Sequence, residues 1–217
     1  MYNKPRLKVC CIKNLEEARL AIEYGADALG LVGKMPGGPG IIPDHLIKEI
    51  AARVPPPVAT VLLTSETSAG QIIEHYKRVN TGCIQIVDDL QEGSHSDIKK
   101  ELPAVKLIQV IHVIDNRSVN KAVQISNSVD AILLDSGNPN KPVKELGGTG
   151  RIHNWDLSKK IVEQTDIPIF LAGGLKPDNI GKAVSRVKPF GIDVCSGLRT
   201  DGRLDRGKLK KFIDNIP

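Results

Sequence analysis

The sequence has few cysteines and no long apolar run. The four cysteines are Cys10, Cys11, Cys83 and Cys195, and none shows Cys-x-x-Cys spacing or a zinc-type pairing with histidine. We therefore expect neither a zinc site nor a disulfide framework. No stretch approaches the roughly 18 apolar residues of a membrane span, and no apolar segment of a signal peptide follows the basic N-terminal residues. These absences predict a cytoplasmic protein with no metal and no membrane partner.

Charge of one sign is not concentrated in any segment. The formal net charge is +5 and the pI is about 9.0, but Lys and Arg are spread among acidic residues, with only a mild basic cluster from Arg199 to Lys211. Such a cluster is more typical of a solvated helix face than of a nucleic-acid surface. No nucleic-acid partner is therefore expected, whereas a modest positive field suits an anionic substrate.

What the sequence does contain is a regular alternation of apolar strands and amphipathic helices. Aromatic residues are only 3% of the chain, so the core is expected to be aliphatic. Strands are predicted at residues 7–12, 27–32, 58–63, 83–87, 105–113, 129–134, 167–172 and 191–195. Helices are predicted at 15–24 with Asn14 as N-cap, at 44–54, after Thr67 or Ser68, at 96–102, from Asn116 or Ser118, at 155–163, at 177–187 and at 206–213.

Eight strands alternating with eight helices predict an α/β fold. Because no domain break interrupts the series, we expect a single (β/α)8 TIM barrel domain over residues 1–217. An open doubly wound sheet is the alternative, and it is disfavoured because no Gly-x-Gly-x-x-Gly motif follows the first strand. No outer helix carries an exceptional apolar stripe, so both a monomer and a homodimer stay open.

The candidate site is centred on the segment from Ala131 to Gly150. An apolar strand there ends in Asp135, and the loop that follows closes on Gly147-Gly148-Thr149-Gly150. A carboxyl at the tip of an apolar strand is costly to bury, and a glycine-rich turn exposes backbone N–H groups that can hold an anion. We expect a phosphorylated small molecule and an Asp135 carboxyl with a raised pKa. The alternative is an ordinary loop or helix-cap carboxylate.

Two later strands also end in small residues, at the barrel end where active sites lie. The expected phosphate pocket comprises Gly148, Thr149, Gly150, Ala172, Gly173, Gly174, Ser196 and Gly197. Pro177 is expected in the first turn of the helix that follows Gly174. For the two adjacent glycines, the alternative is a tight exit from the strand.

Cys10 lies toward the C-terminal end of the first predicted strand and is a candidate catalytic thiol, although a cysteine on a strand is more often an inert apolar residue. Strand alternation predicts that only one of Cys10 and Cys11 faces the barrel interior. Lys8 shares the face of Cys10, where its ammonium group would favour a thiolate. His45 and His75 lie on predicted helices and are expected at the surface.

Six segments carry a resemblance to a known family. They are Lys8-Val9-Cys10, the segment from Gly25 to Gly30, Leu133-Leu134-Asp135-Ser136, Gly147 to Gly150 with Asn154-Trp155, Leu171 to Ile180, and Gly191 to Gly197. In this order they resemble the phosphoribosylanthranilate isomerase family. The resemblance spans nearly the whole chain, and its C-terminal half is the more specific.

The resemblance implies an aldose–ketose isomerase of tryptophan biosynthesis that uses no cofactor. Its phosphosugar substrate would be N-(5-phosphoribosyl)anthranilate, which an Amadori rearrangement converts into a 1-deoxyribulose-5-phosphate aminoketose. In that family the cysteine of the K-x-C strand is the general base and the aspartate of the L-L-D strand is the general acid. The resemblance therefore implies these roles for Cys10 and Asp135.

The chain departs from the family pattern where anthranilate would bind. The family's Ser-Pro-Arg loop is Gly38-Pro39-Gly40 here, so the arginine that grips the anthranilate carboxylate is missing. The glycine after the base is Cys11, and a glutamate after the last strand is Arg199. Lys34 and Arg199 are candidate contacts to the carboxylate.

Two other interpretations stay open. One is a paralogue that isomerises another phosphoribosyl amine or a related sugar phosphate. The other is a catalytically silent barrel that binds a phosphorylated metabolite or a protein partner.

Overall fold

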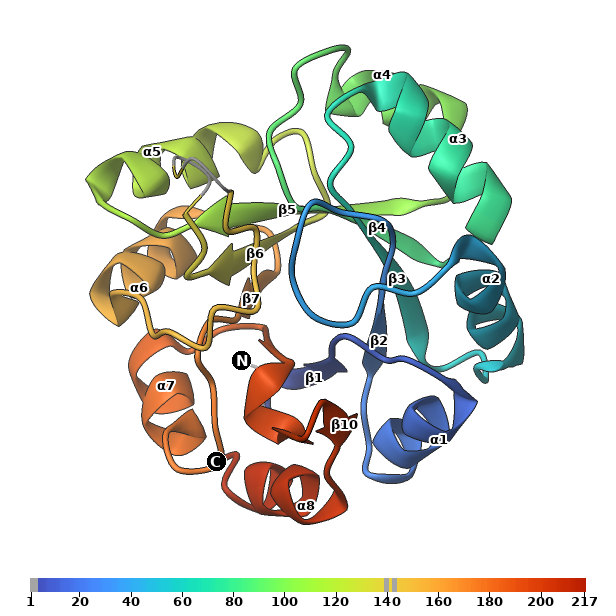
Figure 1. Ribbon diagram of the computed structural model, residues 1–217. Helices are drawn as coiled ribbons and strands as arrows, with labels where there is room; N and C mark the ends of the chain where they lie inside the picture. Colours follow the sequence, from blue (N-terminus) through green and yellow to red (C-terminus); the bar gives the residue numbers. More distant parts are fainter. Residues whose placement is uncertain (1–3, 139–140, 142–143) are drawn as a thin grey trace.

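The computed structural model describes residues 4–138, 141 and 144–217, which form a closed barrel of eight parallel strands surrounded by helices (Figure 1). The strands are β1 (Arg6–Val9), β2 (Ala28–Val32), β3 (Ala59–Thr64), β4 (Cys83–Ile86), β5 (Lys106–His112), β6 (Ala131–Asp135), β7 (Ile169–Leu171) and β8 (Gly191–Val194). The helices are α1 (Leu15–Glu23), α2 (Asp44–Arg53), α3 (Ala69–Val79), α4 (His95–Glu101), α5 (Asn116–Ile125), α6 (Trp155–Gln164), α7 (Ile180–Val187) and α8 (Arg206–Asp214). Because β1 pairs with both β2 and β8, the ring is closed and the barrel prediction is confirmed.

The strands bury both of their faces, which produces two apolar cores. Alternate strand residues such as Leu29 and Leu31 pack outward with helix residues such as Ile47. Residues of the opposite parity, such as Val110 and Leu133, belong to a smaller cluster that fills the barrel interior. This arrangement explains why the strands are continuously apolar in the sequence rather than alternating.

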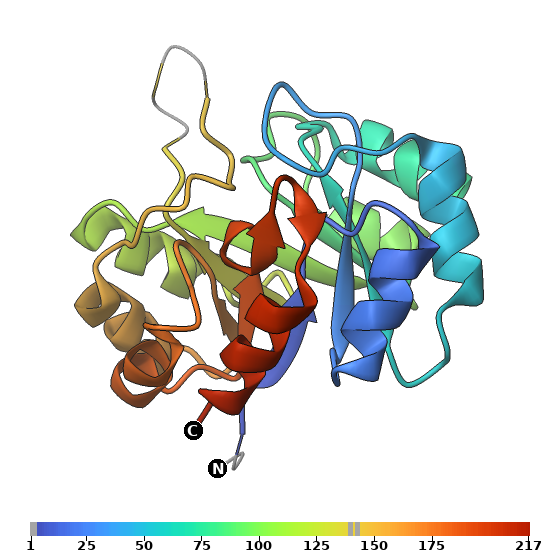
Figure 2. The same cartoon turned by 60° about the horizontal axis from the view of Figure 1, so that its bottom comes forward.

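The long loops and the chain ends lie at opposite ends of the barrel. In Figure 2 the loops that follow β2 and β6 rise at one end, whereas the N- and C-termini lie at the other. Parallel strands place all their carboxyl ends on the side of these loops. Among the described residues, no helix is long and apolar enough to cross a membrane.

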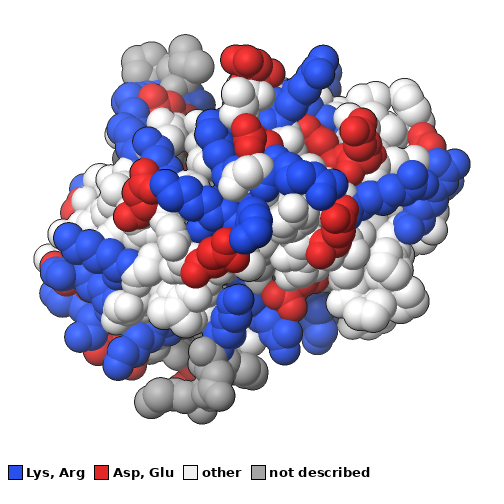
Figure 3. Space-filling view, turned by 90° about the horizontal axis from the view of Figure 1, so that it is seen from below, with Lys and Arg blue, Asp and Glu red and all other residues white. Residues whose placement is uncertain are grey.

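Of the basic cluster from Arg199 to Lys211, the basic residues of α8 form a solvated helix face as expected, whereas Arg199 lies on the strand β9 (Arg199–Thr200) and its side chain is 7% exposed. Arg206, Lys210 and Lys211 of α8 pair with Glu23, Asp214 and Asp178 respectively. Figure 3 shows Lys and Arg interspersed with Asp and Glu on the side of the barrel that faces the viewer. The cationic side chains of α8 are therefore largely balanced by local acids.

The helix expected over residues 177–187 begins later than predicted. α7 starts at Ile180 because Asn179 closes a turn: its side-chain oxygen accepts from the backbone N–H of Lys176 at 2.8 Å, and its amide group donates to the carbonyl of Gly174 at 2.9 Å. Pro177 consequently lies in this turn and not in the first turn of the helix. At α1, by contrast, the predicted N-cap is confirmed, since Asn14 accepts from the backbone N–H of Glu17.

A short insertion after β8 was not predicted. It consists of the 3₁₀ helix η1 (Ser196–Leu198) and an antiparallel hairpin of β9 (Arg199–Thr200) and β10 (Arg203–Leu204). Glu17 of α1 anchors the hairpin, because it pairs with Arg199 at 2.9 Å and accepts from the backbone N–H of Leu204 at 3.0 Å. The insertion is thereby fixed against the first helix.

His45 is exposed, as predicted, but the prediction of an exposed His75 is wrong. The imidazole of His75 is 1% exposed and lies 2.8 Å from Glu66 and 3.2 Å from Asp44. Gly33 makes room for it, since a Cβ at Gly33 would lie 2.5 Å from the ring. Burial opposes the charged ring, but the hydrogen bond and charge of Glu66, with the charge of Asp44, outweigh burial and raise the pKa of His75.

This raised pKa predicts how stability depends on pH. Because the folded chain binds the His75 proton more tightly, the stabilisation is complete below the unfolded pKa of about 6.5 and is lost as the pH rises through the higher folded pKa. We expect His75→Gln to lower the free energy of unfolding most at about pH 6 and least above about pH 8. Urea unfolding across this range measures the difference, and a cost that is independent of pH would contradict the expectation.

Candidate active site

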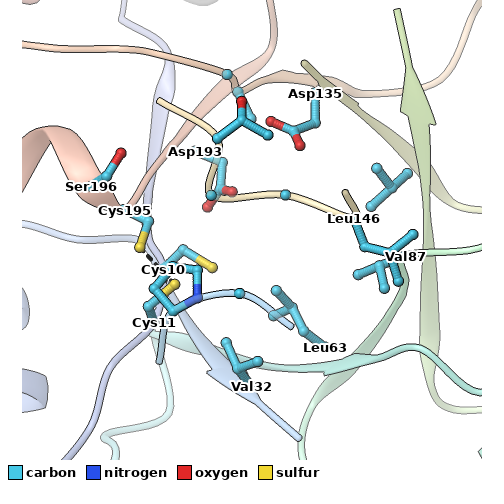
Figure 4. A pocket seen from close by; sticks show the side chains of 18 of the residues that line it. Cys10, Cys11, Val32, Leu63, Val87, Asp135, Leu146, Asp193, Cys195 and Ser196 are labelled. Atoms are coloured by element: carbon cyan, nitrogen blue, oxygen red, sulfur yellow. Dashed lines mark hydrogen bonds between the residues drawn. The ribbon is translucent and has the colours of Figure 1, made fainter. Parts of the chain in front are cut away.

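A cavity opens at the C-terminal end of the barrel, where the sequence placed the site. The open space in and around it, solvent at the mouth included, is about 730 Å³. Figure 4 shows the thiols on one side, Asp135 on the other and Asp193 between them. The apolar part of its wall is formed by Val32, Leu63, Val87, Val110, Leu133 and Leu146.

Asp135 ends β6 and projects into this cavity (Figure 4). Its Oδ2 is buried and has no hydrogen-bond partner among the described residues. Burial raises the pKa of Asp135 and the charge of Asp193 adds to the effect, against the opposing influence of His112 and of the backbone N–H groups of Ser136 and Gly137. A carboxyl that keeps its proton to a higher pH than usual, with an unpaired oxygen in a cavity, can act as a proton donor.

Cys10 follows β1 and is 4% exposed within the cavity wall. Its thiol and the ammonium group of Lys8 both lie over Gly30, at 2.7 and 3.2 Å from the point that a Cβ there would occupy. The two groups are therefore neighbours, as the sequence predicted. Lys8 is itself buried and paired with Asp193, its Nζ lying 2.8 Å from Oδ1.

Cys10 and Cys11 both line the cavity, so the prediction that only one of them would face the interior is wrong. β1 ends at Val9, and Cys11 has a φ of +62°, in the left-handed region. This conformation breaks the strand alternation on which the prediction relied. It costs a non-glycine residue on the order of 1 kcal/mol.

Gly40 stands where the resembling family has its arginine, and it lies against Cys11. It is buried with a φ of +82°, and a Cβ at this position would lie 2.4 Å from the Cβ of Cys11. The side chain of Cys11 thus occupies the space that any side chain at position 40 would need. The two departures from the family pattern, Cys11 and Gly40, are complementary to each other.

Neither candidate contact to a substrate carboxylate lines the cavity. Lys34 is exposed on the loop after β2. Arg199 pairs with Glu17 and donates to the carbonyl groups of Cys10 and Cys11, with a side chain that is 7% exposed. No lysine or arginine occurs among the described residues that line the cavity.

The residues predicted to hold a phosphate converge at one side of the cavity. Those that line it are Gly148, Thr149, Gly150, Ala172, Gly173, Gly174 and Ser196, whereas Gly197 does not. Gly174 has a positive φ, and a Cβ there would lie 2.6 Å from the backbone of Arg151, so the two loops approach only because this residue is glycine. The hydroxyl groups of Ser136 and Thr149, 2.7 Å apart, hold the loop after β6 to its strand.

Sequence reasoning missed Asp193 as a site residue. It lies on β8 in register with Lys8 of β1, and it lines the cavity between the thiol and Asp135. The sequence offered one signal for it, an acidic residue within the apolar eighth strand. Its partner, Lys8, can be identified only once the closed barrel sets the first strand beside the eighth. His112 was also missed: it pairs in register with Asp135, and burial lowers its pKa.

Comparison with known proteins agrees with the resemblance seen in the sequence. The profile of a family described as N-(5′-phosphoribosyl)anthranilate (PRA) isomerase matches residues 7–215. The chain is also similar to N-(5′-phosphoribosyl)anthranilate isomerase 2 of Methanosarcina mazei. These two are 35% identical over 210 residues, which cover 96% of this chain and 92% of that protein.

Two solved structures share the fold over nearly the full length of both chains. One is a phosphoribosyl anthranilate isomerase in complex with reduced 1-(o-carboxyphenylamino)-1-deoxyribulose 5-phosphate, with a TM-score of 0.77, 27% identity and 97% of each chain covered. The other comprises monomers generated from the dimeric enzyme of Thermotoga maritima, with a TM-score of 0.78, 25% identity and 97% of each chain covered.

The contact between Gly40 and Cys11 predicts non-additive effects on stability. We expect Gly40→Ala to cost about 2–3 kcal/mol, because the new Cβ adds overlap with Cys11 to the strain of a positive φ. In a Cys11→Gly background the overlap with the Cys11 side chain is gone, although the Cα of residue 11 would still lie 2.8 Å from the new Cβ, so the cost should fall by about 1 kcal/mol. Urea unfolding of the four proteins gives the coupling, and equal costs in both backgrounds would show that the contact carries no strain.

Proposed function

The chain belongs to the N-(5′-phosphoribosyl)anthranilate isomerase family, and we infer that it catalyses the aldose–ketose isomerisation of N-(5′-phosphoribosyl)anthranilate in tryptophan biosynthesis. The observation that supports this most directly is the placement of a thiol and a protonatable carboxyl across one cavity, beside glycine-rich loops. A silent barrel would have no need of that combination. The substrate is therefore a phosphosugar amine.

We propose Asp135 as the general acid. Its raised pKa and its unpaired Oδ2 support donation of a proton to the ring oxygen of the ribose. Protonation there breaks the bond between C1 and the ring oxygen and opens the furanose to a protonated Schiff base. The Asp135 carboxylate that results faces Asp193, which makes it ready to regain a proton.

We propose Cys10 as the general base. Its thiolate would remove the proton from C2 of the Schiff base, which gives an enolamine that tautomerises to the aminoketose. The neighbouring ammonium group of Lys8 places a positive charge beside the sulfur of Cys10. Asp193 holds that ammonium group in place and keeps the buried charge paired.

The phosphate group is proposed to lie at the glycine-rich side of the cavity. Small residues allow the backbone of three loops to come close to the phosphate. Ser196, whose side chain carries a hydroxyl group, is the first residue of the short helix η1 beside these loops. The proposed contacts are Gly148, Thr149, Gly150, Ala172, Gly173, Gly174 and Ser196. Gly197 would act only by shaping the turn, since a Cβ there would lie 2.0 Å from the carbonyl oxygen of Leu175.

The aromatic amine is proposed to lie against the apolar wall near Val32 and Leu63. No cation among the described residues lines that wall, and Arg199 is already committed to Glu17. We therefore propose that no ion pair holds the carboxylate of the substrate. This observation also favours a second candidate of the same chemistry, the isomerisation of a phosphoribosyl amine that lacks the carboxylate.

A dimeric relative exists in Thermotoga maritima, and for this chain both a monomer and a homodimer stay predictions. The cytoplasmic location likewise stays a prediction.

Removing either proposed proton-transfer group should abolish most of the activity. We expect Cys10→Ser and Asp135→Asn each to lower kcat by about 10²–10⁴. The assay follows the loss of phosphoribosylanthranilate fluorescence, with the substrate generated from anthranilate and phosphoribosyl pyrophosphate by the transferase. Cys83→Ser, at a thiol outside the cavity, is the matched control. Full activity of either active-site variant would remove that residue from the mechanism.

The missing cation predicts weak discrimination at the amine. We expect the phosphoribosyl amine made from aniline to be isomerised with a kcat/KM within about tenfold of that for the anthranilate compound. A charged hydrogen bond is worth about 1.5–3 kcal/mol. If a cation held the carboxylate, the aniline compound would therefore lose more than tenfold in kcat/KM. NMR can follow the anomeric proton of both substrates, and a loss of a hundredfold or more would show that a cation holds the carboxylate after all.

A further inference from the structure

Three of the four cysteines gather where β1 and β8 end side by side. The Sγ atoms of Cys11 and Cys195 lie 2.6 Å apart, although 184 positions separate these residues in the sequence, and Cys10 is the immediate neighbour of Cys11 (Figure 4). The fourth cysteine, Cys83, begins β4 and does not line the cavity. The proposed isomerisation uses only Cys10, which leaves the pair of Cys11 and Cys195 without a role.

Arg199 lies beside this pair and makes its two thiols unequal. The hydrogen bond with Cys11 lowers the pKa of Cys195, and the charge of Arg199 adds to this effect against the cost of burial. Hydrogen bonds with Cys10 and Cys195, together with burial, raise the pKa of Cys11. Of the two, Cys195 is therefore the thiol that ionises more readily and is the better placed to attack.

Cys195 is also the more accessible of the two. It is only half-buried and lines the cavity, whereas Cys11 is 5% exposed. A small molecule that enters the cavity therefore meets Cys195 first, with Cys11 directly behind it. An exposed attacking thiol with a buried second thiol is the arrangement that completes thiol–disulfide exchange within one chain.

The backbone aims Cys11 at its partner. The left-handed φ of +62° turns its side chain toward the end of β8, and Gly40 leaves the space that this side chain fills. Arg199 fixes the turn by donating to the carbonyl groups of both Cys10 and Cys11. A strained residue held in this way is a signal of function.

We propose that Cys11 and Cys195 form a redox-active dithiol, which small-molecule disulfides oxidise reversibly to a disulfide that joins the ends of β1 and β8. The Cys195 thiolate attacks one sulfur of the small disulfide, forms a mixed disulfide and releases one thiolate. Cys11 then loses its proton and attacks the sulfur of Cys195, and the second small thiol leaves. The products are the protein disulfide, one thiolate and one thiol that carries the proton of Cys11, so the protein is oxidised as the small disulfide is reduced.

The geometry makes this bond easy to form and leaves the proposed catalytic base free. The sulfurs need to approach from 2.6 Å to about 2.05 Å, and Cys10 retains its thiol. The new bond would tie the first strand to the last and so close most of the chain into one loop. Such a cross-link restricts the unfolded state and should raise the melting temperature.

The test oxidises the natural protein with oxidised glutathione and stops the reaction with acid. We expect the number of free thiols to fall from four to two, with peptide mapping by mass spectrometry assigning the bond to Cys11 and Cys195. The melting temperature should rise by several degrees and return to its starting value with dithiothreitol. These readouts do not depend on isomerase activity, so they are separate from the proposed function.

Three variants sharpen the result. Cys11→Ser should trap glutathione on Cys195, Cys195→Ser should form no internal disulfide, and the matched control Cys83→Ser should behave as the natural chain does. An unchanged thiol count, or a bond mapped to Cys10, would overturn the inference. The mapping on the natural protein decides this even if a variant does not fold.

Discussion

The buried ion pair between Lys8 and Asp193 is the interaction on which the site depends. It joins the first and last strands at the register position where the barrel closes. The ammonium group lies beside the thiol of Cys10, and the charge of Asp193 contributes to the raised pKa of Asp135. One pair thus places a positive charge beside the thiol of Cys10 and a negative charge near Asp135. Removing one partner would leave an uncompensated buried charge, at a cost of about 3–5 kcal/mol.

The two halves of the cavity have different relationships to the family. On the side proposed for the phosphate, small residues and tight loops let the backbone approach an anion. On the side proposed for the amine, Cys11 and Gly40 stand where the resemblance implies a glycine and an arginine, and the side chain of Cys11 fills the space that a side chain at position 40 would need. The chemistry of proton transfer can therefore persist while recognition of the amine changes.

The sequence predicted the barrel and the end at which the cavity opens because these follow from patterns repeated along the chain. Eight apolar strands gave the topology, and strand ends rich in small residues or ending in Asp135 marked the end where the cavity lies. The features it missed depend on contacts between distant segments. His75 is buried because Gly33 makes room for its ring. Asp193 can be recognised as a cavity residue only once its ion pair with Lys8 of the first strand is known. The orientation of Cys11 depends on one left-handed φ, which no strand pattern encodes.

The adjoining ends of β1 and β8 hold two thiols that differ in the cation beside them. Cys10 lies next to Lys8, whose charge Asp193 balances, and Cys195 lies next to Arg199, whose charge Glu17 balances. Each cation has its own acid, so neither buried positive charge is left uncompensated. The two environments still interact, because the charge of Asp193 acts on Cys195 and Cys11 hydrogen-bonds with both Cys10 and Cys195. Cys11 lies between the other two thiols, and these hydrogen bonds together with burial raise its pKa.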